Sequence, residues 1–473
     1  MTRVLSVTSE CAPLVKTGGL ADVAGALPGA LDTLGDEVRT LIPGYPAVMA
    51  KLENTRIVMA LPDHFGGEAK VLAATVGTLR LLVLEAPHLY QRSGSIYLSP
   101  EGQDWHDNPE RFAALSFAAA LIAEQGVDGW RPEIVHGHDW QAGLVPGYLH
   151  ELGVATPFVF TIHNIAFHGN TGADRLHNLR LSDWRMTPDH FEYWGQISAM
   201  KAGLMGAARI TTVSQTYAEE LLTPDFGMGM DGVLNRRKAD LVGIVNGIDT
   251  DVWNPSSDQE IVQYSSVAGK APNKAALRKE FGLPETDGPL CVLISRLTWQ
   301  KGIDLLLEAL PSLLTGGGQL ALLGSGEAGL EAAVKDAAAK YDNVAVKIGY
   351  DEALSHRMIA GGDAILVPSR FEPCGLTQLY GLRYGTLPVV ALTGGLADTV
   401  INASPAAMAA NVATGIQFSP INGLGLSNAF NRLNRLYQDQ AAWTQMQDNA
   451  MRQAVSWDHS AKIYHALYAE LAG

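Results

Sequence analysis

Two basic residues and one carboxylate stand in glycine-containing loops of this 473-residue chain. Arg296 and Lys301 lie five residues apart in "SRLTWQKGID", ahead of an apolar stretch with helical spacing. A lysine near the positive end of a helix dipole is unfavourable unless an anion lies close by, so this pair is suited to holding a diphosphate. Glu372, in "SRFEPCGL", precedes another predicted helix, whose dipole favours its negative charge. Solvated charges beside a helix start are the alternative for the two cations, and a helix-capping carboxylate is the alternative for Glu372.

The hexapeptide TGGLAD occurs twice, at residues 17–22 and 393–398. Paired glycines let the backbone approach a ligand closely, and a following helix start offers unpaired amide hydrogens. In the first copy, Lys16 adds a positive charge beside Gly18 and Gly19. We therefore expect each copy to form an anion-binding loop facing a shared ligand. A tight strand-to-helix turn is the alternative.

Histidines and an aspartate gather in "HGHDWQAG" and "TIHNIAFHG", each at the end of a short apolar run. His136, His138, Asp139, His163 and His168 could in principle supply a zinc or iron site. No other motif supplies a metal's helix-borne ligands, so no metal is expected. Hydrogen bonds to sugar hydroxyls are the favoured interpretation, because such hydroxyls both donate and accept.

The stretch "GSGEAG" at residues 324–329 matches the glycine pattern of dinucleotide-binding loops. Asp351 lies about 20 residues beyond it, as that fingerprint requires. The match follows the second predicted strand of its half, whereas the fingerprint normally opens the fold. A nicotinamide dehydrogenase is therefore the less favoured enzyme class.

The elements that must position these residues follow a repeated strand, loop and helix pattern. Apolar runs such as "VLSVTS", "IVHGH" and "FVFTIH" alternate with helical patterns up to "VGIVNG", and the pattern restarts at "PLCVLISRL". Such alternation predicts parallel sheets covered on both faces, with ligands beyond the carboxyl ends of the strands. Pro28 is expected to kink or divide the first helix.

We expect an α/β protein of two Rossmann-like, doubly wound domains with a cleft between them. The predicted domains are residues 1–245 and 246–455, since 473 residues exceed what one core usually serves. Residues 456–473 are expected to form a C-terminal helix, with packing back on the first domain as one arrangement.

The net charge, the apolar stretches and the cysteine content exclude several kinds of partner and favour one compartment. The net charge of −15 repels phosphate backbones and anionic membranes, so neither nucleic acid nor a membrane is expected as a partner. No stretch reaches the ~18 apolar residues of a membrane span. Three cysteines are too few for a disulfide framework, which favours a cytoplasmic protein.

Taken together, the motifs resemble the bacterial glycogen synthase family, the ADP-glucose-dependent glucan synthases related to plant starch synthases. "KTGGLADV", "HDWQAG", "TIHNIAF", "NGID", "SRLTWQKGID", "PSRFEPCGLTQLYGLRYG" and "TGGLADTV" occur in the family's order along the whole chain. The resemblance implies a GT-B fold and retaining transfer of glucose from ADP-glucose to the 4-hydroxyl at the non-reducing end of glycogen or another α-1,4-glucan. It implies no cofactor. A transferase using UDP-glucose or a different acceptor, and a non-catalytic glucan-binding protein, are the alternatives.

The resemblance also implies roles for individual residues. Glu372 would be the catalytic carboxylate beside the donor glucose, and Arg296 and Lys301 would neutralise the departing diphosphate. His163 would contact the donor glucose, and a histidine such as this one would account for any sharp loss of activity near neutral pH. Asp139 and Tyr97 are implied on the acceptor side. The remaining donor-side positions are Lys16, Gly18, Gly19, Asn246, Tyr350, Cys374, Gly375, Leu376 and Thr377.

Three positions depart from the family's pattern. Tyr380 stands eight residues beyond Glu372, where the wider retaining GT-B pattern has a second glutamate, so a carboxylate contact to the donor ribose is not expected. Leu392 stands where relatives often carry arginine, which removes one phosphate-side charge and could weaken donor affinity. "HGHDW" replaces the more usual "HAHDW".

Overall fold

The chain divides into two units in the computed structural model, which describes residues 1–473. The first unit comprises Met1–Asn246 together with Trp457–Gly473, and the second comprises Gly247–Ser456. The sequence-based boundaries, 245/246 and 455/456, fall one residue before these divisions. The C-terminal segment thus belongs to the first unit.

A nine-stranded sheet forms the centre of the first unit, in the order β12-β11-β7-β6-β1-β2-β5-β4-β3. All neighbours from β12 to β5 are parallel, whereas β4 pairs antiparallel with both β5 and β3. Only Gly77 and Thr78 join β4 to β5, and Gly77 has φ +57°, so this connection forms a tight hairpin. The strands are β1 (Arg3–Val7), β2 (Glu37–Pro43), β3 (Glu53–Leu61), β4 (Ala69–Val76), β5 (Leu79–Glu85), β6 (Ile134–His138), β7 (Phe158–Ile162), β11 (Arg209–Thr212) and β12 (Leu241–Gly243).

Helices and a small sheet complete the first unit. The helix α1 runs unbroken through Pro28, so the expected division of this helix is wrong; its buried apolar face holds the helix together. The small sheet is antiparallel and contains β8 (Asn170–Gly172), β9 (Glu192–Tyr193) and β10 (Gln196–Ser198). The helices are α1 (Gly19–Asp32), α2 (Pro46–Met49), α3 (Pro87–Tyr90), α4 (Asn108–Gln125), α5 (Val145–Glu151), α6 (Ala199–Gly206), α7 (Gln215–Glu220), α8 (Asp231–Arg236) and α18 (Asp458–Ala472).

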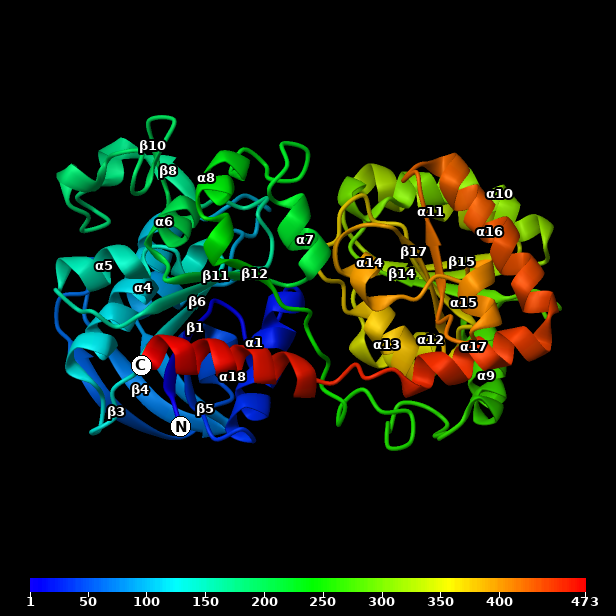
Figure 1. Cartoon of the computed structure of the whole chain (residues 1–473), viewed down its shortest axis with the longest axis horizontal. Coiled ribbons are helices and arrows are strands. Elements are labelled where there is room, and N and C mark those ends of the chain that lie inside the picture. Colours follow the sequence, from blue (N-terminus) through cyan, green and yellow to red (C-terminus); the bar gives the residue numbers. More distant parts are fainter. The chain divides into compact units, whose positions relative to one another are not determined.

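The C-terminal helix α18 packs on α1 and on strand β6. In Figure 1 this red helix lies alongside the blue α1. Tyr468 is fully buried in a cluster with Leu27, and its hydroxyl lies 2.7 Å from Nδ1 of His136. The last residues of the chain therefore complete the core of its first half.

The second unit is built on a six-stranded parallel sheet in the order β15-β14-β13-β16-β17-β18. Strands β13 and β14 bury nearly every side chain, as parallel strands covered on both faces do. The strands are β13 (Leu290–Ile294), β14 (Gln319–Gly324), β15 (Val344–Ile348), β16 (Ala364–Val367), β17 (Leu387–Ala391) and β18 (Ile416–Phe418). The helices are α9 (Ala271–Phe281), α10 (Ile303–Thr315), α11 (Ala328–Lys340), α12 (Glu352–Gly361), α13 (Thr377–Tyr384), α14 (Gly394–Thr399), α15 (Pro405–Ala409), α16 (Gly423–Gln438) and α17 (Gln440–Arg452).

Each sheet has a point at which the strand order reverses. In the first unit it lies between β1 and β6, and in the second between β13 and β16. Open α/β sheets bind ligands beyond the carboxyl ends of the strands at such a point. The loop after β13 carries Arg296 and Lys301, and the loop after β16 carries Glu372. The topology therefore brings the predicted cations and the predicted carboxylate to one edge of the second sheet.

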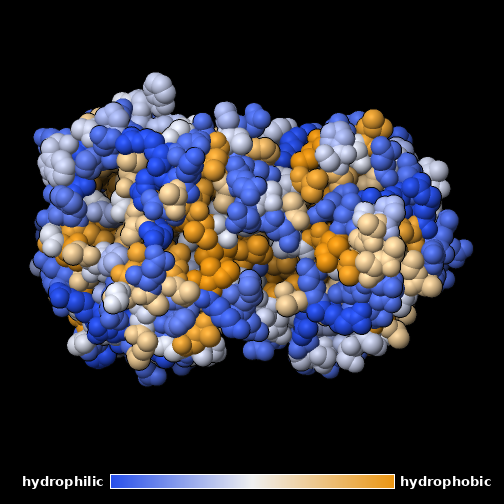
Figure 2. Space-filling model, viewed as in Figure 1, coloured by the Kyte–Doolittle hydropathy of each residue, from blue (hydrophilic) through white to orange (hydrophobic).

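On the face drawn in Figure 2, hydrophilic residues cover much of each unit and apolar residues form smaller areas among them. None of the helices combines the length and the apolar character that crossing a lipid bilayer requires.

Candidate active site

The loops after β13 and β16 are tied together by hydrogen bonds. The guanidinium group of Arg370 binds both carboxylate oxygens of Asp304, at 2.8 and 2.6 Å, and donates to the carbonyl oxygen of Trp299 at 2.7 Å. The amide of Arg370 donates to the carbonyl of Gln300, whose side chain donates to the carbonyl of Phe371. Bidentate charge-assisted bonds of this kind fix geometry as well as adding energy. The two loops are thus held in a defined relation to each other.

Lys301 and Glu372 form an ion pair at this junction. Nζ of Lys301 lies 2.6 Å from Oε2 of Glu372, and the hydroxyl of Ser369 donates to the same oxygen at 2.8 Å. Both charged side chains are largely buried, with exposed fractions of 19% and 8%. The anion that the lysine requires near the start of α10 is therefore the carboxylate of Glu372. Ser369 was not anticipated from the sequence, because an isolated serine after a strand carries no signal.

The second TGGLAD copy packs against the backbone of the Glu372 loop. The amide of Gly395 donates to the carbonyls of Glu372 and Pro373, at 3.1 and 3.2 Å. A Cβ atom at Gly394 would lie 2.0 Å from the Glu372 carbonyl oxygen, and one at Gly395 would lie 2.3 Å from that of Cys374. Gly394 also has φ +45°, a conformation that favours glycine. Here the paired glycines permit close backbone packing against the protein's own loop.

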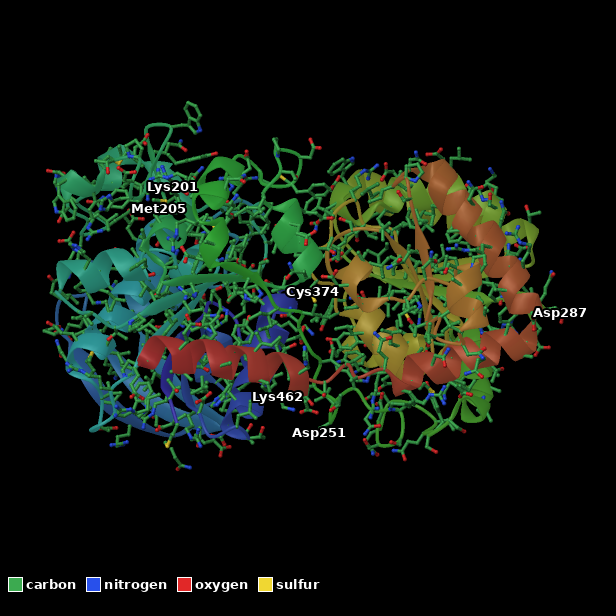
Figure 3. The ribbon with its side chains drawn as sticks, in the orientation of Figure 1. Lys201, Met205, Asp251, Asp287, Cys374 and Lys462 are labelled. Atoms are coloured by element: carbon green, nitrogen blue, oxygen red, sulfur yellow. The ribbon has the colours of Figure 1, made fainter.

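Gln378 fastens the other side of the same loop. Its amide group donates to the carbonyls of Cys374 and Gly375, at 3.0 and 2.9 Å, and to the hydroxyl of Thr399 at 3.2 Å. Its Oε1 atom is buried without a hydrogen-bond partner. Gly375 has φ +72°, so the turn needs a residue without a side chain. Cys374 is buried in this turn and is labelled in Figure 3.

The remaining sequence-predicted positions of the second unit differ in exposure. Leu376 and Thr377 form the start of α13, directly after the loop of Glu372. The side chain of Arg296 is exposed and forms no ion pair, so it is open to an anion from solvent. Tyr350 is 72% exposed and its hydroxyl donates to Glu352.

Two of the three glycines of "GSGEAG" are explained by packing against the loop of Arg296. A Cβ atom at Gly324 would lie 2.1 Å from the carbonyl oxygen of Ser295, and one at Gly326 would lie 2.2 Å from that of Leu297. The two glycines therefore let the loops after β13 and β14 run side by side. This contact accounts for Gly324 and Gly326 without a dinucleotide, whereas a Cβ atom at Gly329, in the first turn of α11, would meet no atom within 4 Å.

The departures at Tyr380 and Leu392 have different surroundings. The ring of Tyr380 stacks on Trp253 at 3.8 Å between centroids, and Trp253 stacks on His356 at 3.9 Å on its other face. The tyrosine thus joins a buried aromatic stack in the second unit. Leu392 is 49% exposed after β17, and nothing in the structure explains the choice of leucine there.

In the first unit, the first TGGLAD copy binds the carboxylate of Glu10. The carboxylate of Glu10 accepts hydrogen bonds from the amides of Thr17 and Gly18, at 2.5 and 3.2 Å, and from the Thr17 hydroxyl at 2.6 Å. Gly19 begins α1, and Lys16 pairs with Asp22 at 2.9 Å. In the structure these loop amides bind an internal carboxylate, and the expectation that the loop faces a ligand shared with the second copy stays a prediction.

Tyr97 joins the same network from a distant part of the chain. Its hydroxyl donates to Glu10 at 2.6 Å and lies 2.7 Å from the hydroxyl of Ser9. Burial and the nearby Glu10 carboxylate raise the pKa of Tyr97 well above its ordinary value. Glu10, which the sequence analysis missed, therefore links two predicted positions. The signal available was a single glutamate in the loop after the first strand.

Three of the histidines form hydrogen bonds near the carboxyl ends of β6 and β7, His138 and His163 in one chain and His136 separately. Nδ1 of His138 lies 3.0 Å from Nε2 of His163, and Nε2 of His138 lies 3.2 Å from the Ser6 hydroxyl. His136 Nε2 lies 2.6 Å from the hydroxyl of Thr161. His168 stands apart from this chain, with its backbone carbonyl accepting from Ser198. No group of three or more histidine, cysteine or acidic side chains is arranged to hold a metal ion.

Burial controls the protonation of this cluster. It lowers the pKa of His163 well below 6.5 and lowers that of His138 to about 3, so both rings are neutral around pH 7. The expectation that His163 titrates near neutral pH is therefore wrong, because burial disfavours the charged ring.

Asp139 is the group of this cluster whose pKa lies near neutrality. Burial raises its pKa to about 7, although its Oδ1 accepts from the amides of His163 and Asn164 at 2.7 and 3.3 Å. Its backbone has φ 54° and ψ −175°, a conformation that ordinarily requires glycine. Such strain is retained where the surrounding structure fixes a side chain for function.

Asn246 ends the first unit with an unused acceptor. Its side chain is 7% exposed, and its Oδ1 atom is buried without a hydrogen-bond partner.

The chain is similar in sequence and in structure to known glycosyltransferases. A family model of the starch synthase catalytic domain matches residues 3–236, and one of glycosyl transferases group 1 matches residues 273–444. The glycogen synthase of Jannaschia sp. strain CCS1 is 66% identical over 472 residues and that of Paracoccus denitrificans strain Pd 1222 is 61% identical over 473, with 100% of each chain covered. The catalytic domain of starch synthase IV from Arabidopsis thaliana, solved bound to ADP and acarbose, aligns with a TM-score of 0.89 at 32% identity and covers 100% of this chain and 99% of its own.

Two α/β units with parallel sheets, each with its polar loops at the point of strand reversal, define a glycosyltransferase of the GT-B class. The expected fold class is thereby confirmed. Within this class, the chain belongs to the glycogen synthase family.

Proposed function

We propose that the protein transfers glucose from ADP-glucose to the 4-hydroxyl at the non-reducing end of an α-1,4-glucan such as glycogen, with retention at the anomeric carbon. The observation that carries this proposal is the buried contact between Lys301 and Glu372, with exposed Arg296 in the same loop as the lysine. It is supported by relatives named glycogen synthase over the full chain and by a related starch synthase structure that contains ADP and acarbose.

In this mechanism the two basic side chains act on the leaving group. Negative charge grows on the departing diphosphate as the glycosidic bond breaks, so Arg296 and Lys301 would stabilise the transition state more than the ground state. The arriving diphosphate would also take over part of the charge compensation that Glu372 gives Lys301 in the structure.

Glu372 would act on the sugar. As the leaving group departs, the glucose becomes oxocarbenium-like, and a carboxylate close to it stabilises the positive charge. Ser369 donates to Oε2 of this carboxylate, and the glycines of the second TGGLAD copy fix its backbone. We propose that Cys374, Gly375, Leu376 and Thr377 line the same donor site and that Tyr350 lies near the adenine.

The first unit would supply the groups that face the sugars. We propose that Asp139 and Tyr97 act on the acceptor side, and that His163, neutral at pH 7, contacts a donor glucose hydroxyl. The unpaired Oδ1 of Asn246 would accept a hydrogen bond from a sugar hydroxyl. Lys16, with Gly18 and Gly19, would contribute to donor binding.

The decisive experiment measures incorporation of labelled glucose into glycogen from ADP-glucose and from UDP-glucose, with Glu372→Ala alongside. We expect faster incorporation from ADP-glucose and a loss of at least 10³-fold in the variant. Equal or greater use of UDP-glucose would contradict the donor assignment. Glucan binding without turnover of either donor would instead identify a non-catalytic binding protein.

A further inference from the structure

A cavity of about 240 Å³ lies within the second unit, away from the loops of Glu372 and Lys301. It is bordered by the segment between residues 254 and 266, by the last turn of α13 and by the last turn of α17. Its polar lining consists mainly of Ser256, Ser265, Ser266, Arg383, Asp448 and Arg452.

The charges of this cavity are not neutralised within the protein. Arg383, Arg452 and Asp448 form no ion pair; Arg452 donates only to the side-chain amide oxygen of Asn449, at 2.9 Å. Arg383 is half-buried, and its Nε atom is buried without a hydrogen-bond acceptor. Leaving a charged donor unsatisfied and out of water costs free energy. The lining of the cavity therefore carries two guanidinium groups and one carboxylate, with positive charge in excess.

The helix ends explain only part of this arrangement. Arginines in the last turns of α13 and α17 complement the negative end of a helix dipole, which accounts for two cations at the surface. That argument does not account for a hollow that places serine hydroxyls beside the two arginine side chains. Guanidinium groups with neighbouring hydroxyls are the donors that select oxyanions, above all phosphate.

The volume limits the size of the ligand. Pockets for drug-sized molecules begin near 300 Å³, so this cavity suits a smaller one. The apolar parts of Tyr264 and Met451 complete the lining and can contact the short carbon skeleton of a ligand. We propose that the cavity binds the phosphate group of a small phosphate monoester between Arg383 and Arg452, with Asp448 weakening the binding of the anion.

Isothermal titration calorimetry at constant ionic strength tests this site with inorganic phosphate, ribose 5-phosphate and ribose. The measurements use the full chain carrying Arg296→Gln and Lys301→Gln, so that phosphate binding at the proposed donor site does not contribute. We expect both phosphates to bind and ribose not to bind. Failure of the glucosyltransferase proposal would leave this result unchanged, because the two sites share no residue.

Substitutions then assign the ligand to the cavity. Arg383→Gln and Arg452→Gln should each weaken ribose 5-phosphate binding at least tenfold, whereas Asp448→Asn should strengthen it severalfold. Arg435→Gln, at an exposed arginine in the last turn of α16, is the matched control and should change nothing. Ser265→Phe, in the exposed segment, should fill the cavity and abolish binding without lowering the melting temperature.

Three results would overturn the proposal. The first is that neither inorganic phosphate nor ribose 5-phosphate binds. The second is unchanged affinity in both arginine variants that retain the wild-type melting temperature. The third is equal affinity for ribose and ribose 5-phosphate, which would mean that the phosphate group is not recognised.

Discussion

The close packing of Gly395 against the backbone of Cys374 predicts that the substitution Gly395→Ala strongly lowers the rate of glucose transfer. The added Cβ atom would lie 2.3 Å from the carbonyl oxygen of Cys374 and 2.4 Å from its Cα. Both are backbone atoms, and the oxygen is also held by Gln378 at 3.0 Å, so neither can rotate away. To restore ordinary contact distances, the loop must recede by roughly 1 Å, a displacement that commonly costs ~10²-fold in rate.

We therefore expect Gly395→Ala to lower kcat for glucose transfer about 100-fold. Forced insertion of a methyl group should also lower the free energy of unfolding by about 1–3 kcal/mol. The assay is labelled-glucose incorporation at saturating donor and acceptor, combined with urea unfolding of the same preparations. Because the strain acts on the position of the carboxylate, kcat should fall while the variant remains folded at 25 °C.

Gly329→Ala is the matched control. Gly329 lies in the first turn of α11, and no atom lies within 4 Å of the position its Cβ would take. This substitution should leave kcat unchanged and stabilise the helix by up to ~1 kcal/mol. The reasoning is refuted if Gly395→Ala retains a kcat within twofold of the wild type with an unchanged free energy of unfolding.

Three further substitutions test other parts of the molecule. In Lys301→Ala, the loss of a cation next to the developing diphosphate charge should lower kcat 10²–10³-fold in the same assay, and a loss below threefold would remove Lys301 from the proposed mechanism. In Glu10→Gln, the amides of Thr17 and Gly18 lose a charged acceptor, so urea unfolding should show a decrease of about 1–3 kcal/mol, whereas the exposed Glu68→Gln should show none. The pKa of Asp139, raised from 3.8 to about 7, means that the folded state binds its proton more tightly than the unfolded state between pH 4 and 7. The free energy of unfolding should therefore fall as pH rises through this range, by at most ~1.4 kcal/mol per pH unit from this group, and Asp139→Asn should remove that contribution in urea titrations at pH 5 and pH 7. Identical pH slopes for the two proteins would reject the assignment.

The sequence was informative wherever a local rule was sufficient. The alternation of strands and helices predicted two α/β units, and the helix-dipole argument predicted that Lys301 needs an anion nearby. That anion is Glu372, 71 residues further along the chain. The expected anion was a diphosphate, whereas the structure pairs Lys301 with Glu372, because both loops follow strands that lie side by side in the sheet. Diphosphate binding by Lys301 stays a prediction.

The sequence was uninformative where a residue's role depends on a partner that no pattern specifies. Glu10 could not be identified alone, since its importance comes from Thr17, Gly18 and the distant Tyr97. His163 was expected to titrate near pH 7, but its pKa depends on burial, which only the folded structure determines. The antiparallel edge of the first sheet was also missed, because the Gly77–Thr78 turn is a short signal.

The return of α18 to the first unit makes that unit discontinuous in the chain, whereas the second unit is one uninterrupted segment. During synthesis, the ribosome must therefore complete residues 247–456 before the first unit can bury Leu27 against Tyr468. Nascent chains shorter than this leave an apolar strip of the first unit uncovered, although domains generally fold in order from the N-terminus. The second unit can therefore reach its native state before the first unit does. Chaperone binding to stalled nascent chains should be concentrated on residues 1–246.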